Sequence, residues 1–244
     1  MLDIVKAKIT GHILIKYSDT GEVLLDTHND VLYGNISSAL AYSLLGNSNS
    51  FLAYIAFGNG GAYVSPTGTI SYKPSLGGAA SLLKNPLANL YNTIFAKKLT
   101  SSTVYVPTTV NTTNYEDLVV DVTLSYSEPP TSLVSNAIQQ AAIDNSTFIG
   151  SSTSNTTGIT SLSPNEFVFN ELGLFAGTTD LFSGSFTETT TDVDNFVAQG
   201  PNYSTTTGAK SKLMLTHAIF HPVQKAANRS IEIIYTLRIQ MGAA

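Results

Sequence analysis

The sequence predicts a mainly β protein, an antiparallel β-sandwich or barrel-like module with one or two short helices and long polar loops. Segments in which apolar and polar residues alternate recur along the chain, as they do in half-buried strands. Charged residues make up only 12% of the chain, and Ser, Thr and Asn carry its polarity. No strand–helix–strand rhythm is present. We expect residues 1–244 to form one domain, with loop insertions near 101–114, 145–160 and 184–208.

Composition argues against several classes of protein. A net charge of −5 disfavours sequence-directed nucleic-acid binding, which requires clustered Lys and Arg. The absence of cysteine excludes a disulfide framework and a thiolate metal site. The start, MLDIVKAKIT, lacks the features of a signal peptide, and no apolar run approaches the ~20 residues of a membrane helix. We therefore expect a soluble protein made in a cytoplasm, without a membrane partner.

The first element is a hairpin over residues 9–27. Its connection, Ser18-Asp19-Thr20-Gly21, is typical of a type I turn closed by a glycine with positive φ. That register places Tyr17 opposite Val23 and Ile15 opposite Leu25. The residues expected on one face of the first strand are Ile9, Gly11, Ile13, Ile15 and Tyr17.

A short helix is predicted next, over residues 36–45. Asn35 is a suitable N-cap and Gly46 a suitable stop. Within the helix, apolar residues recur every four positions, which predicts one buried stripe. The residues of that stripe are Ile36, Leu40 and Leu44.

The stretch AYIAFGNGG, residues 53–61, follows as an apolar strand that breaks at Gly58-Asn59-Gly60-Gly61. Glycine and asparagine tolerate positive φ, so the chain either turns sharply here or lies close to another segment. A phosphate loop would need a helix directly after the glycines. Tyr63-Val64-Ser65-Pro66 do not begin one. We predict a structural elbow without a bound cofactor.

The remaining pattern is mostly strand. Residues 89–99 fit a strand or a helix, and we favour the strand. Residues 132–143 fit a short helix. The other strands are expected at 69–73, 115–126, 167–175, 213–220 and 230–241.

Two sets of residues suggest metal binding on first sight. His217 and His221 would share a metal on a helix, but on a strand they are ~13 Å apart. Asp192 and Asp194 begin like a calcium loop, but the required glycine and final glutamate are missing. We expect packed or hydrogen-bonded histidines and no metal site.

The carboxylates offer two further candidates. Glu116, Asp117 and Asp121 could form a pair for glycoside cleavage, although acids on the polar face of a strand are usually solvated. Glu171 lies among large apolar residues in FVFNELGLF, so it requires a cationic or donor partner. Arg229 and Arg238 are the only arginines. We predict that one of them forms a buried or interface ion pair with Glu171.

Three blocks in this order resemble a group of tailed-bacteriophage virion structural proteins. They are the hairpin and helix GHILIKYSDTGEVLLDTHNDVLYGNISSALAYSL, then IAFGNGG followed by Pro66-Thr67-Gly68, and finally FNELGLF with MLTHAIFHPVQKAANRSIEIIYTLRIQ. The resemblance implies a non-enzymatic β-rich subunit that forms a homo-oligomeric ring or collar at the neck, portal, tail or baseplate. Its implied location is the virion, after assembly in the host cytoplasm, and its implied partners are other phage neck, portal, tail or fibre proteins.

Two other functions remain open from the sequence. A receptor- or carbohydrate-binding module on a fibre is suggested by four tyrosines in predicted loops. A polysaccharide hydrolase is suggested only by the carboxylates named above. The four tyrosines are Tyr63, Tyr72, Tyr105 and Tyr203.

Overall fold

The fold is that of a computed structural model. The residues it describes are 5–46, 51–64, 69–77, 82–85, 88–100, 102–107, 114–128, 167–177, 204–205, 208–209 and 213–243. The helix expected at 132–143, the loop at 145–160 and most of the loop at 184–208 lie outside these residues.

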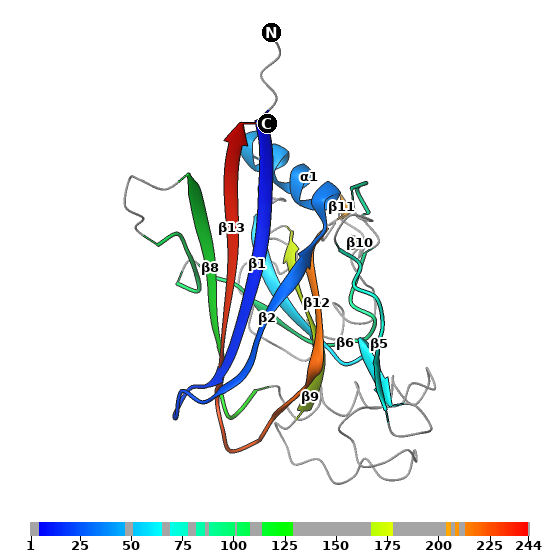
Figure 1. Ribbon diagram of the computed structural model, residues 1–244, viewed down its shortest axis with the longest axis vertical. Helices are drawn as coiled ribbons and strands as arrows, with labels where there is room; N and C mark the ends of the chain where they lie inside the picture. The colour runs from blue at the N-terminus through cyan, green and yellow to red at the C-terminus, as the bar shows by residue number, and fades with distance from the viewer. Residues whose placement is uncertain are drawn as a thin grey trace.

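The fold is mainly β, as the sequence predicts, and is built on one curled antiparallel sheet of nine strands (Figure 1). The strand order is β6-β3-β9-β12-β2-β1-β13-β8-β7. The bounds are β1 Val5–Tyr17, β2 Val23–Val31, β3 Leu52–Gly58, β6 Thr93–Lys98, β7 Val104–Tyr105, β8 Tyr115–Leu124, β9 Phe167–Ala176, β12 Leu213–Lys225 and β13 Ile231–Ala243. Two short ladders pair β4 Ala62–Val64 with β5 Ile70–Tyr72, and β10 Ser204–Thr205 with β11 Gly208–Ala209.

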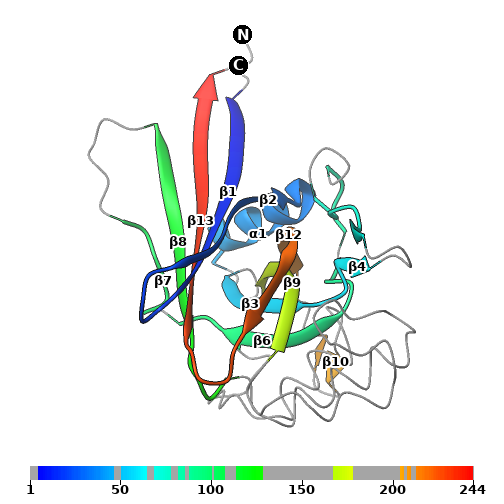
Figure 2. The ribbon, with the colours of Figure 1, turned by 60° about the horizontal axis from the view of Figure 1, so that its bottom comes forward.

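Strand β2 joins the two halves of the curled sheet. Its first part pairs with β1, and its end pairs with β12 through Val31 and Asp30. The half containing β1, β13 and β8 therefore faces the half containing β12, β9 and β3 (Figure 2). Apolar side chains from both halves fill the space between them. Among the fully buried ones are Ile13, Val122, Ile233, Phe57, Phe169 and Leu174.

The β1–β2 hairpin confirms most of its predicted geometry. Gly21 has φ 71°, as the turn requires, and Ile15 lies opposite Leu25. A β-bulge follows, so Val23 lies opposite Lys16 and not opposite Tyr17 as predicted. The bulge adds one residue to β2, a local shift that alternation alone does not reveal.

The single helix among the described residues, α1 (Tyr33–Leu44), begins earlier than predicted. Gly46 ends it with φ 72°, as expected. Asn35 does not cap the helix. It is buried inside the first turn, where its amide donates to the carbonyls of Asn85 and Met214 and its Oδ1 accepts from the Asn85 N–H. No helix in the described part of the chain is long and apolar enough to cross a membrane.

Only the first third of the predicted apolar stripe on α1 is buried. Ile36 is 5% exposed and packs in the core. Leu40 is 39% exposed and Leu44 is 90% exposed. The helix therefore presents Leu40 and Leu44 as exposed apolar side chains within the described part of the chain.

Candidate functional site

The predicted elbow is a closely packed turn between two strands. Strand β3 ends at Gly58, and β4 begins at Ala62. All four residues between Gly58 and Gly61 are buried. The prediction of a close approach is confirmed, but its conformational reason is wrong, because none of the three glycines has a left-handed φ. Glycine is required at these positions because neighbouring residues leave little or no room for a side chain.

The space around each glycine differs. A Cβ on Gly58 would lie 2.4 Å from Glu171 Oε1, and one on Gly60 would lie 2.7 Å from the Asn92 nitrogen. Both distances are shorter than real Cβ contacts. At Gly61 the nearest atom, Ile219 Cγ2, would be 3.1 Å away. Gly58 and Gly60 are therefore fixed by packing, whereas Gly61 has some room.

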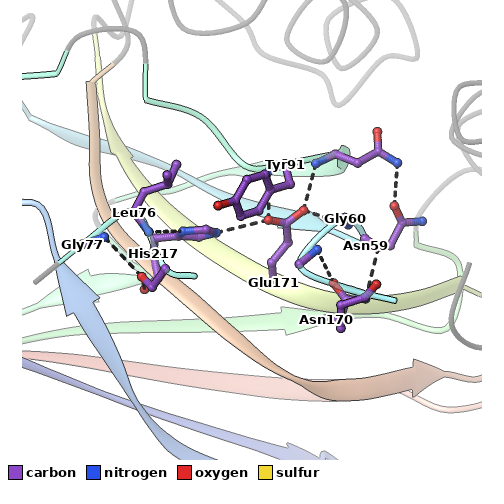
Figure 3. Close-up of polar contacts among 12 residues, drawn as sticks. Asn59, Gly60, Leu76, Gly77, Tyr91, Asn170, Glu171 and His217 are labelled. Atoms are coloured by element: carbon purple, nitrogen blue, oxygen red, sulfur yellow. Dashed lines mark hydrogen bonds and ion pairs between the residues drawn. The ribbon is translucent and has the colours of Figure 1, made fainter. Parts of the chain in front are cut away.

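The elbow packs against the Glu171 carboxylate, which Figure 3 shows at the centre of the network. Oε1 accepts hydrogen bonds from the Gly60 and Asn92 backbone N–H groups, both at 2.9 Å. Oε2 accepts from the Tyr91 N–H at 3.0 Å and contacts His217 Nε2 at 3.2 Å. The elbow thus binds an anion, as glycine-rich turns often do. Its anion is a side chain of the same protein.

A second layer of amides holds the same turn. The Gly61 N–H donates to Asn170 Oδ1 at 2.9 Å, and Asn170 Nδ2 donates to the Asn59 carbonyl at 3.1 Å. Asn92 Nδ2 donates to Asn59 Oδ1 at 2.6 Å. Adjacent residues of β9, Asn170 and Glu171, therefore clamp the elbow and connect it to the segment before β6.

His217 on β12 extends the network to the segment after β5 (Figure 3). Its Nδ1 accepts a hydrogen bond from the Leu76 N–H at 3.1 Å, and its carbonyl accepts from Ser75 Oγ at 3.3 Å. Because Nδ1 is an acceptor, the ring proton of the neutral imidazole must lie on Nε2. His217 therefore donates to Glu171 Oε2.

This assignment predicts a specific NMR signature. In ¹⁵N-labelled protein, the ring nitrogens of His217 should show the Nε2–H tautomer, with Nδ1 bearing no proton. Glu171→Gln should perturb the Nε2 resonance while the Leu76 amide keeps its shift. A ring proton on Nδ1 would contradict the arrangement, and His28, which is exposed, serves as the reference histidine.

The predicted pairing of Glu171 with an arginine is wrong. Arg229 lies at the tip of the β1–β2 hairpin, where it contacts Asp19 at 2.9 Å and stacks on Tyr17. Arg238 binds Asp117 through two nitrogens, both at 2.8 Å. Arg229 lies in the connection between β12 and β13 and Arg238 on the exposed face of β13, so neither reaches Glu171. Backbone N–H groups and one histidine can satisfy a buried carboxylate without a full cation.

The other candidate residues do not converge on one site. His221 is exposed and contacts the Tyr72 hydroxyl through Nδ1 at 3.3 Å, apart from the buried His217. Asp117 and Asp121 lie four positions apart on β8, and Asp117 is occupied by Arg238. Asp192 and Asp194 lie outside the described residues. Within the described ranges, no three His, Asp or Glu side chains are placed to hold a metal ion.

The two aspartates of β8 differ in electrostatic environment. Hydrogen bonding to Arg238 lowers the pKa of Asp117. Burial, and then the charge of Glu232, raise the pKa of Asp121, although Lys16 opposes this. A raised carboxyl pKa means that the ionised side chain destabilises the folded protein at neutral pH. This cost disappears once the pH falls below the pKa of the same carboxyl in the unfolded chain, ~4.

We therefore expect Asp121→Asn to raise the free energy of unfolding by about 0.5 kcal/mol at pH 7 and by nothing at pH 3. Asp117→Asn is the matched control and should behave oppositely, with a loss at pH 7 that shrinks on acidification. Urea unfolding at several pH values measures both. A gain from Asp121→Asn that persists at pH 3 would rule out the electrostatic cause.

Sequence reasoning identified the elbow and Glu171 separately but missed that they bind each other. It also missed His217 as a partner, and the Tyr91 and Asn92 backbone donors. Backbone donors leave no signature in a sequence. Two signals were available: a single acid within an apolar strand, which requires hydrogen-bond partners, and a cluster of glycines, which indicates the close approach of another segment.

The network can hold segments together but offers no free reactive atom. Glu171 and His217 are both 0% exposed, and each of their polar side-chain atoms has a partner inside the chain. Burial, and then the charge of Glu171, raise the pKa of the neighbouring Tyr91 hydroxyl, which donates to the Pro74 carbonyl. No protein-family model, curated protein or solved structure matches this chain.

Proposed function

We propose that this protein is a non-enzymatic structural subunit of a tailed-phage virion that associates with copies of itself and docks neighbouring virion proteins. A ring or collar at the neck, portal, tail or baseplate is the form we infer. The resemblance of the three sequence blocks suggests the virion, and the fold adds a physical reason for self-association.

The observation that carries the proposal is the exposure of large leucines at both ends of α1. Leu44 and Leu45 at the end of the helix are 90% and 79% exposed, and Leu82 and Leu83 are 70% and 83% exposed. The segment of Leu82 and Leu83 runs against the start of the helix, because a Cβ on Gly34 would lie 2.3 Å from the Leu83 backbone. Several large apolar side chains around one element favour a protein partner.

The central polar network supports the same proposal. Its donors and acceptors attach three connecting segments to β9 and β12. The elbow, Glu171 and His217 therefore hold these segments in fixed positions. A subunit of an assembly must present its surfaces in fixed positions, because a loose subunit loses conformational entropy when it binds. The rigid elbow fits that requirement.

Light scattering after size-exclusion chromatography, together with negative-stain imaging of the full chain, tests the proposal. We expect a closed oligomer, and we expect Leu44→Lys with Leu45→Lys to weaken it without lowering the melting temperature. Ser37→Lys on the same helix is the control, since Ser37 is already exposed and polar. A chain that stays monomeric at high concentration would overturn the proposal.

A carbohydrate-binding head is the alternative, and the tyrosine geometry weighs against it. Tyr63 lies opposite Ser71 and Tyr72 lies opposite Ala62 in the β4–β5 ladder. Neighbouring ladder positions face opposite sides, so these two rings do not form one stacking platform. Tyr105 is on the distant strand β7, and Tyr203 lies outside the described residues. Binding on a glycan array by the multimeric protein would revive this alternative.

A further inference from the structure

Residues 73–77, which follow β5, form a short segment that we call the strap. Its first residue is fixed to the elbow, because the Lys73 N–H donates to the Gly61 carbonyl at 2.8 Å. Its last residue packs on β2, since a Cβ on Gly77 would lie 2.4 Å from the Asp30 Cβ. Between these two ends the strap is attached to β12.

The attachment to β12 is made by His217. Its Nδ1 accepts a hydrogen bond from the Leu76 N–H at 3.1 Å, as Figure 3 shows, and its carbonyl accepts from Ser75 Oγ at 3.3 Å. The Gly77 N–H donates in turn to Ser75 Oγ at 3.2 Å. The Leu76 side chain packs against a buried apolar cluster that includes Phe175. The strap therefore covers apolar surface, and an imidazole nitrogen holds its backbone there.

The contact between His217 and Leu76 depends on the protonation state of the ring. A neutral imidazole has one nitrogen without a proton, and here that nitrogen is Nδ1, because Nε2 donates to Glu171 Oε2. An imidazolium carries a proton on both nitrogens and accepts no hydrogen bond. Its Nδ1–H would point at the Leu76 N–H. The charged ring and the attached strap therefore exclude each other.

We propose that the strap is a pH-controlled element, attached to β12 while His217 is neutral and released when His217 takes a second proton. Proton binding and strap attachment oppose each other, so acid favours release, and release favours proton uptake. Release uncovers the Leu76 side chain and the apolar surface beneath it. It does not require the proposed self-association.

Charged and titratable groups from several elements face His217. Glu171 on β9 contacts Nε2, and Asp30 on β2 lies opposite His217 in the strand register. Tyr91 lies 5.7 Å from the imidazole between ring centroids, and it stays neutral because burial, and then Glu171, raise the pKa of its hydroxyl. The Lys73 Nζ lies over the Tyr91 ring, 4.5 Å from its centroid. The two carboxylates attract a second proton to the ring, whereas burial and the N–H of the strap oppose it.

The rest of the network should survive protonation of the ring. Glu171 keeps the backbone donors of Gly60, Tyr91 and Asn92, and it gains a full ion pair with His217. The hydrogen bond that fixes the first residue of the strap to the elbow involves no titratable group. Release is therefore local, and it differs from acid unfolding of the whole chain.

Exchange of the Leu76 amide, compared at pH 7.5 and pH 5.0 after correction for the intrinsic exchange rate, tests the proposal on the full chain. We expect its protection to fall about tenfold at pH 5.0, because one hydrogen bond is lost. The Gly60 and Lys73 amides should keep their protection. In ¹⁵N-labelled protein, protonation of His217 Nδ1 should follow the same pH midpoint as the loss at Leu76.

His217→Asn provides an acceptor that does not titrate. Its Oδ1 can occupy the place of Nδ1, so the Leu76 N–H has a partner at both pH values, and its exchange should not depend on pH. His221→Asn is the matched control on the same strand. It should keep the pH dependence of the wild type, because the His221 ring is exposed and contacts the Tyr72 hydroxyl.

The wild-type measurements decide the outcome even if His217→Asn fails to fold. Loss of Leu76 protection together with Nδ1 protonation supports the proposal. A Leu76 amide that stays protected while the His217 ring carries two protons overturns it. A ring that stays neutral until the whole chain unfolds overturns it as well, and so does a pH dependence that persists in folded His217→Asn.

Discussion

Replacing Glu171 with alanine is expected to lower the free energy of unfolding by about 4 kcal/mol. The substitution removes the acceptor for three backbone N–H groups, those of Gly60, Tyr91 and Asn92, and for His217. Buried donors without partners each cost ~1–3 kcal/mol, and solvent does not reach this position. Urea unfolding followed by circular dichroism measures the loss.

Glu171→Gln is the size-matched control for this experiment. It keeps one oxygen for the Gly60 and Asn92 donors but places an NH₂ group against the Tyr91 N–H. We expect it to cost about half as much as alanine, with faster exchange at the Tyr91 amide. Equal stability of the glutamine variant and the wild type would show that the charged carboxylate is not required.

Replacing Gly60 with alanine is expected to cost about 3 kcal/mol or to prevent folding. Its added Cβ would lie 2.7 Å from the Asn92 nitrogen and 2.8 Å from the Tyr91 Cβ, so the elbow must move off the Glu171 carboxylate. Overpacking of a rigid interior typically costs 1–3 kcal/mol, and here a hydrogen bond is lost as well. Thermal unfolding monitored by circular dichroism gives the comparison.

Gly61→Ala is the matched control, one residue away in the same turn. Its Cβ would meet Ile219 and Asn170 at 3.1 and 3.2 Å, which a small shift can relieve, so we expect a cost of about 1 kcal/mol or less. Equal costs at Gly60 and Gly61 would contradict the packing explanation. The sequence alone gives no reason to separate these two glycines.

Patterns of local origin were predictable in this protein. Alternation in Tyr115–Leu124 and Ile231–Ala243 identified two half-buried strands, because strand side chains point to opposite faces in turn. The turn at Gly21 and the helix end at Gly46 also followed from local chemistry, since glycine adopts positive φ at little cost.

Contacts between distant segments were not predictable in the same way. Arg229 and Arg238 were the natural partners for Glu171 by charge, but sheet register placed them beside Asp19 and Asp117. Asn35 looked like a helix cap because caps are local, whereas its partners Asn85 and Met214 are remote in the chain. The predicted register of Val23 failed because one extra residue in β2 forms a bulge.

By itself the sequence determined the β class, most strands, the hairpin turn, the end of the helix and the position of the elbow. These depend on the period of apolar residues and on backbone preferences, which act over a few residues. Tertiary structure alone decided that the elbow cradles Glu171, that His217 completes the hydrogen bonds of that carboxylate, and that β2 leaves β1 after Asn29 to pair with β12. Those features require strands β3, β9 and β12, far apart in the chain, to meet in one register.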